Sequence, residues 1–134
     1  MSKAAMGITF DKELRTFTHG ESITGKVWWQ SEKEPTQIDL ELKWVTDGAG
    51  TVDVGVTDKA TLGAAYHHLG CEGALSFTLH VPQDAPPSYN GSIVSINWSV
   101  KATLDLPWAI DCKTVEEIIV SPTSTALDLS SYAR

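Results

Sequence analysis

The fold is decided by residues 93–104, whose sequence is IVSINWSVKATL. Apolar residues occupy every second position from Val94 to Leu104, and Ser, Asn, Thr or Lys occupies the positions between them. A helix would scatter the apolar side chains around its axis, whereas a β-strand places them all on one face. The stretch therefore predicts a β-strand with one buried and one solvated face.

Alternation of the same kind recurs along the chain, in the stretches 23–30, 38–44, 52–56 and 75–81, with shorter candidates at 7–10 and 115–120. In the 52–56 stretch, we expect Val52, Val54 and Val56 to form the apolar face. Turn-forming residues separate the stretches, and none of them has the period of an amphipathic helix. These seven strand candidates predict an all-β fold, a single antiparallel β-sandwich of the immunoglobulin-like type.

Two segments are less defined. Residues 59–70 are rich in Ala and Gly and fit a loop, a short helical turn or an irregular edge strand. Residues 122–134 are rich in Ser and Thr, and we interpret them as a flexible C-terminal tail. The domain prediction is thus a sandwich over residues 7–121 followed by this tail.

Length and charge restrict the function. A chain of 134 residues fits one domain. Its formal net charge of -7 argues against nucleic acid and anionic lipid as partners, because both select basic surfaces. No run of about 18 apolar residues could span a membrane, and no apolar segment typical of a signal peptide follows the N-terminus. We expect a cytoplasmic protein without membrane insertion, with Cys71 and Cys112 as reduced thiols.

Three motifs follow one another in a fixed order: FTHGESITGKV at 17–27, IDLELKW at 38–44, and a proline-rich linker with the long strand at 81–102, extended by LDLPW at 104–108. Together they resemble the arrestin-like clan, which includes animal arrestins, the related retromer subunit and bacterial sporulation-control proteins. The resemblance covers residues 7–121. It implies an arrestin-like β-sandwich and a tendency toward protein–protein interaction, and it identifies no receptor or cargo.

The motifs have a physical meaning and also show departures from the clan. Gly20 permits a tight turn, and Gly25 lets two backbones approach each other. Animal arrestins contain two such sandwiches, and this chain has room for one. Their first strand carries a basic pair that recognises phosphate. Lys12 and Arg15 are the only nearby candidates here and Glu13 lies between them, so phosphate recognition is not transferred to this chain.

Residues that could perform chemistry are few. His67, His68 and Cys71 form the only candidate metal or Cys/His cluster, but adjacent residues of a strand face opposite ways and no further ligand pattern completes a tetrahedral site. We expect exposed loop histidines and a small buried thiol at Cys71. The sequence thus predicts no enzyme, no cofactor and no metal. The alternatives are a small metal- or Cys-dependent enzyme at these three residues, or a structural subunit of an assembly.

Tryptophans provide the candidate binding residues. Trp29, Trp44 and Trp98 share the phase of the apolar positions in their strands, which predicts core positions. Trp28 has the opposite phase and shares its face with Lys26, so both are candidates for contacts with a protein partner. Trp108 follows a proline at the end of the long strand; a plug at the end of the sandwich is the favoured role, and partner binding is the alternative. The predicted function is an adaptor- or scaffold-like module that binds a protein partner through sheet edges or loops, with a homodimer as a further possibility.

Overall fold

The computed structural model describes residues 4–48, 53–62, 69–84, 87–91, 94–107 and 110–121. Over these residues the chain forms nine strands: β1 (Ala4–Phe10), β2 (Thr16–Thr18), β3 (Ser22–Ser31), β4 (Gln37–Gly48), β5 (Asp53–Leu62), β6 (Glu72–His80), β7 (Tyr89–Asn90), β8 (Val94–Asp105) and β9 (Cys112–Ser121). The described part of the chain contains no helix, and hence none long and apolar enough to cross a membrane.

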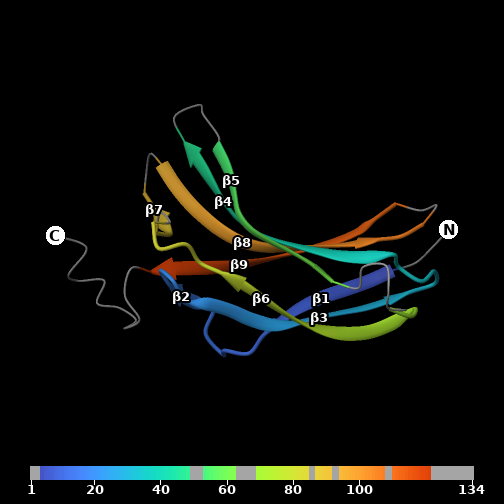
Figure 1. Ribbon diagram of the computed structural model, residues 1–134. Helices are drawn as coiled ribbons and strands as arrows, with labels where there is room; N and C mark the ends of the chain where they lie inside the picture. Colours follow the sequence, from blue (N-terminus) through green and yellow to red (C-terminus); the bar gives the residue numbers. More distant parts are fainter. Residues whose placement is uncertain are drawn as a thin grey trace.

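The strands form two sheets, which Figure 1 shows as two layers. One sheet has the order β1-β3-β6, and the other has the order β2-β9-β8-β4-β5, with β7 paired to β8. All pairs are antiparallel except β2 with β9, which is parallel. The predicted all-β sandwich is therefore confirmed.

The core lies between the two sheets and follows the predicted phases. Trp98, Val100 and Leu104 of β8 are fully or almost fully buried, as are Ile38 and Leu40 of β4. Further large core side chains are Leu42 of β4 and, from the other strands, Ile8, Phe17, Ile23, Val27, Trp29, Phe77, Leu79, Ile118 and Val120. Trp44 is partly buried and packs against this cluster. The core positions predicted for the three tryptophans thus hold, with Trp44 at the margin.

Strand β5 departs from the prediction. Val54 and Val56 are 59% and 44% exposed, so the expected valine face is not buried. A register shift between Leu42 and Lys43 of β4 inserts an extra residue, Thr57, into β5. Beyond this bulge the two valines share a face with Lys43 and not with the core residues of β4. In addition, Figure 1 shows this end of the β4–β5 hairpin rising away from the three-stranded sheet. Val52 lies outside the described residues.

Other elements refine the sequence predictions. Residues 59–62 continue β5 at the edge of its sheet, in agreement with the edge-strand alternative for that segment. Strands β2 and β7 were not predicted. They span three and two residues, which is too short for an alternating pattern to be recognised.

Candidate functional site

The outer face of β1-β3-β6 carries Trp28. Its indole is 41% exposed and lies across Gly7 of β1, since a Cβ atom at Gly7 would come within 2.5 Å of Trp28 Nε1. The register places Gly7 and Ala74 on either side of Trp28. The outward exposure predicted from the phase of β3 is therefore found.

Small and polar side chains surround this tryptophan. We define the Trp28 face by the outward positions of the three strands: Ala5, Gly7, Thr9, Ser22, Thr24, Lys26, Trp28, Gln30, Glu72, Ala74, Ser76, Thr78 and His80. Lys26 and Glu72 are the charged residues of this set, and both are exposed. Between the small residues Gly7 and Ala74, the indole presents a flat apolar surface that can be covered with little loss of side-chain entropy.

The other predicted site residues are distributed differently. Trp108, His67 and His68 lie outside the described residues. Cys71 is exposed, so the expectation of a buried thiol was wrong. It lies immediately before β6, where its Sγ is 3.6 Å from the Glu32 carbonyl oxygen. Cys71 and Cys112 are both free thiols, and burial raises the pKa of Cys112. Among the described residues, no group of three His, Cys, Asp or Glu side chains could hold a metal ion.

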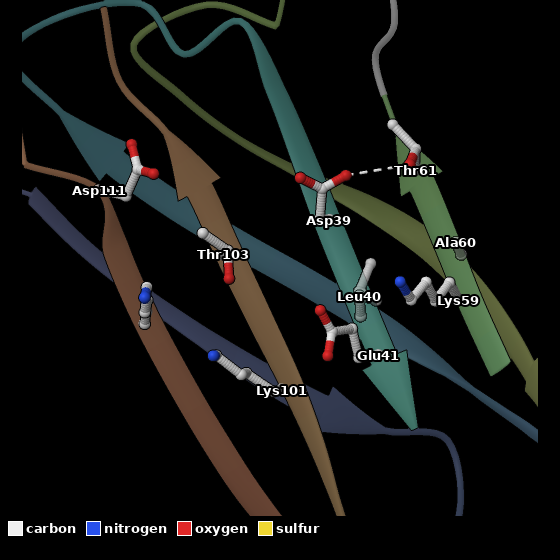
Figure 2. A pocket seen from close by; sticks show the side chains of 10 residues that line it. Asp39, Leu40, Glu41, Lys59, Ala60, Thr61, Lys101, Thr103 and Asp111 are labelled. Carbon is white, nitrogen blue, oxygen red and sulfur yellow. Dashed lines mark hydrogen bonds between the residues drawn. The ribbon is translucent and has the colours of Figure 1, made fainter. Parts of the chain in front are cut away.

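A polar groove of about 490 Å³ crosses the outer face of the larger sheet (Figure 2). Its charged lining comprises three lysines and three acids: Lys59, Lys101, Lys113, Asp39, Glu41 and Asp111. Glu41 pairs in register with Lys59 on one side and Lys101 on the other. Asp39 accepts a hydrogen bond of 2.9 Å from the Thr61 hydroxyl. Opposite charges therefore balance along the groove, which suits a polar contact surface better than a site selective for one sign of charge.

Sequence reasoning missed this groove. The alternation at 38–44 and 93–104 defines a polar face on each strand, but it does not define which strands become neighbours. The charged residues on those polar faces were the available signal.

Asp105 lies close to Asp39 and Asp111. Partial burial raises its pKa, and the negative charges of Asp111 and Asp39, together with hydrogen bonds to them, raise it further. The folded state therefore binds a proton at Asp105 more readily than the unfolded chain does. Ionised Asp105 thus opposes folding above this raised pKa, and the penalty disappears as the pH falls through it.

We expect Asp105→Asn to stabilise the fold at neutral pH by no more than about 1 kcal/mol, because solvent screens a partly exposed group. The advantage over wild type should shrink as the pH is lowered into the range where Asp105 is protonated. Thermal melts between neutral and mildly acidic pH measure this trend. Asp84→Asn, in an exposed turn, is the control for removing one charge. A gain that does not depend on pH would contradict the interpretation.

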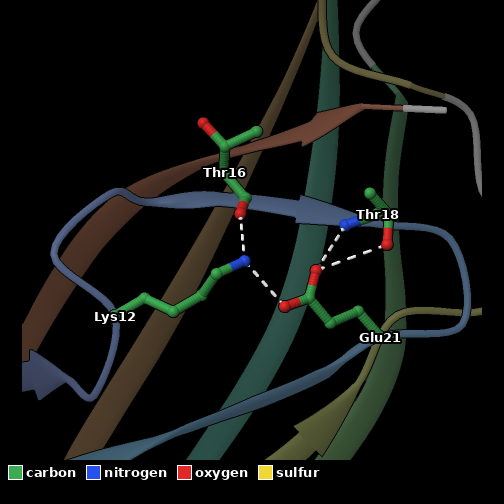
Figure 3. Close-up of polar contacts among 4 residues, drawn as sticks. All are labelled: Lys12, Thr16, Thr18 and Glu21. Carbon is green, nitrogen blue, oxygen red and sulfur yellow. Dashed lines mark hydrogen bonds and ion pairs between the residues drawn. The ribbon is translucent and has the colours of Figure 1, made fainter. Parts of the chain in front are cut away.

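The turn between β2 and β3 is organised by Glu21 (Figure 3). Its carboxylate accepts hydrogen bonds from the Lys12 ammonium at 2.6 Å and from the Thr18 amide at 2.8 Å. Burial acts against ionisation of Glu21, but Lys12 and Thr18 together outweigh it and hold the pKa below its ordinary value. Gly20 has a φ of 79°, a left-handed conformation that favours glycine. The Gly-Glu pair of the sequence motif therefore has a structural role.

Lys12 and Arg15 are both engaged within the fold. Lys12 also donates to the Thr16 carbonyl at 2.6 Å, and its ammonium lies 4.6 Å from the centre of the Phe17 ring. Arg15 forms an ion pair with Glu116 and lies over the Phe10 ring. These contacts give both cations a structural role within the fold.

Comparisons with known proteins identify the class of fold. The family model for the arrestin (or S-antigen) N-terminal domain matches residues 72–126, which include β6 to β9. The crystal structure of Spo0M, a sporulation control protein from Bacillus subtilis, is similar with a TM-score of 0.68 and 21% sequence identity. The match covers 88% of this chain and 49% of that one, so this chain spans about half the length of Spo0M. A comparison with curated proteins found no match.

The protein has the arrestin-like β-sandwich fold, and both findings support the arrestin-like clan that the sequence motifs indicated. At this level of identity, the likeness to Spo0M concerns the fold. The role in sporulation that its title states is that protein's own.

Proposed function

We propose that this domain is a non-catalytic interaction module, adaptor- or scaffold-like, that binds a protein partner through the Trp28 face in the cytoplasm. The arrestin-like fold supports a role in protein interaction. Nucleic acid and inserted membrane are not part of the proposal. The net charge of -7 and the single lysine on the Trp28 face both disfavour polyanionic ligands.

The exposed indole of Trp28 is the observation that carries this proposal. Burying a side chain of this size is worth roughly 2 kcal/mol or more, and the isolated domain gains only part of this because the ring stays 41% exposed. A partner that covers the ring recovers the rest. Tryptophan is also enriched among the residues that dominate interface energetics. The absence of a side chain at Gly7 lets the indole lie against the sheet, where one of its faces is open to a partner.

Affinity capture with matched variants tests the proposal. Wild-type protein, Trp28→Ala and Val115→Ala are immobilised in equal amounts and exposed to native lysate. Val115 is 51% exposed on β9 of the other sheet, so it controls for the loss of an exposed apolar side chain. We expect a protein that binds to wild type and to Val115→Ala but at least about tenfold more weakly to Trp28→Ala. Equal capture by all three proteins would show that the Trp28 face is not the binding surface.

A further inference from the structure

Strand β5 forms one edge of the larger sheet. Within the described ranges it pairs with β4 alone. Its two halves have different surroundings. At the bulge, Asp58 points toward the other sheet, and its carboxylate accepts a 2.7 Å hydrogen bond from the His80 amide of β6. This contact joins β5 to the other sheet at the bulge, between residues 53–57 and residues 59–62. Residues 53–57 lie on the other side of Asp58, where the hairpin rises away from the three-stranded sheet (Figure 1).

Residues 53–57 of β5 present an apolar outer face. Val54 and Val56 are 59% and 44% exposed, and the half-buried Val45 of β4 lies beside Val54 in register. On the opposite face, the Trp44 indole covers Gly55, so that a Cβ atom there would overlap the ring. This short segment is therefore backed by an aromatic ring and has β-branched side chains in solvent. Natural edge strands usually avoid that combination by carrying charges or proline.

We infer that residues 53–57 pair with the same residues of a second copy, in antiparallel register centred on Gly55. The segment Val54-Gly55-Val56 is palindromic, so a two-fold axis at Gly55 places Val54 opposite Val56 of the second copy and Val56 opposite Val54. The four valines then form two cross-strand pairs on one face, which is a stabilising arrangement.

The charges and the centre of the segment fit the same register. Asp53 comes opposite Thr57 of the second copy, so no like charges are opposed. At the two-fold axis each copy contributes Gly55, which has no side chain that could hinder strand pairing. The Trp44 ring of each copy lies over Gly55 of the same copy. A strand from an unrelated partner would need a complementary sequence, whereas a second copy already provides one. This pairing would extend the sheet continuously from one copy into the other.

The dimer should be weak. Stable interfaces generally bury about 1,200–2,000 Å², and one short strand pair buries less than this. We therefore expect a dissociation constant of about 10–100 μM. The dimer contact is made by the larger sheet, whereas Trp28 lies on the three-stranded sheet. Dimer formation is therefore independent of the proposed function.

Sedimentation equilibrium of the full chain, over about 10 to about 1,000 μM, tests the inference against the monomer mass of 14.5 kDa. The mass should rise toward twice this value with concentration. The double variant Val54→Lys/Val56→Lys should remain monomeric at every concentration and keep the wild-type melting temperature, because both side chains are exposed. Val115→Lys, the matched control on β9, and Trp28→Ala should both dimerise as wild type does.

Disulfide trapping tests the register. In a background of Cys71→Ser and Cys112→Ser, protein with Val54→Cys is mixed with protein carrying Val56→Cys. The mixture should form a disulfide-linked dimer in several-fold higher yield than either protein alone, because position 54 lies opposite position 56 and only diagonal to itself. Three results would overturn the inference: a monomeric wild type at the highest concentration, a dimer that persists in the double-lysine variant, or equal trapping in the mixture and in the separate proteins.

Discussion

Trp29→Ala is expected to reduce the free energy of unfolding by about 3–5 kcal/mol, as large-to-small changes of a buried aromatic residue do. Trp29 is 3% exposed and lies across Gly73 of β6, which offers no side chain that could fill the space. Its Nε1 donates a 3.0 Å hydrogen bond to the Gly70 carbonyl, and this acceptor would lose its partner. Domains of this size are generally stable by only about 5–15 kcal/mol, so much of the stability would be lost.

Trp28→Ala is the informative comparison in the same urea titration. The two tryptophans are adjacent on β3 but face opposite sides of the sheet. Because the Trp28 ring is already 41% exposed and covers only the surface of Gly7, its removal should cost about 1 kcal/mol or less. Trp29→Phe should reduce the free energy of unfolding less than Trp29→Ala does, because phenylalanine still fills much of the space of the indole. If Trp28→Ala unfolds the domain as readily as Trp29→Ala does, both rings belong to the core and β3 offers no binding face.

This pair also shows what the sequence can predict. The phase of one strand was sufficient to place Trp29 inside and Trp28 outside, because β3 is regular over its full length between β1 and β6. The same reasoning was wrong for Val54 and Val56. Val54 and Val56 still alternate with other residues, but the bulge at Thr57 places both valines on the outer face of the sheet and not on the core face. Periodicity identifies two faces of a strand, and only the tertiary arrangement decides which one is covered.

The surfaces depend still more on neighbours that the sequence does not specify. The charged groove combines side chains from β4, β5, β8 and β9, and the proximity of Asp105 to Asp39 and Asp111 arises only from strand register and the turn after β8. The exposure of Cys71 likewise follows from its position immediately before β6, next to the Glu32 carbonyl. The exposure of Trp28 could be predicted because no register shift interrupts β3, so Trp28 stays on the face opposite to the apolar positions of the same strand.

Gly25→Ala is expected to destabilise the fold by about 1–3 kcal/mol, because overpacking between two paired backbones cannot relax cheaply. Gly25 is buried in β3 between Phe10 of β1 and Phe77 of β6. A Cβ atom there would overlap the Thr9 carbonyl oxygen and come within 3.1 Å of both Phe10 Cα and the Phe77 ring. The glycine in the motif at 17–27 thus allows β1 to approach β3 closely.

Gly7→Ala in the same strand pair is the matched control for Gly25→Ala. At Gly7 the atoms in the way belong to the Trp28 indole, an exposed side chain that can turn away. Its cost should therefore stay below about 1 kcal/mol. Urea midpoints of the two variants, measured together with wild type, give the comparison. If Gly7→Ala loses as much stability as Gly25→Ala, contact with the neighbouring backbone is not the reason why an alanine at position 25 is unfavourable. If neither variant loses stability, β1 is free to move away from β3. Only a larger loss at Gly25 agrees with a close approach of two backbones, because the added methyl group is the same at both sites and only the atoms that it meets differ.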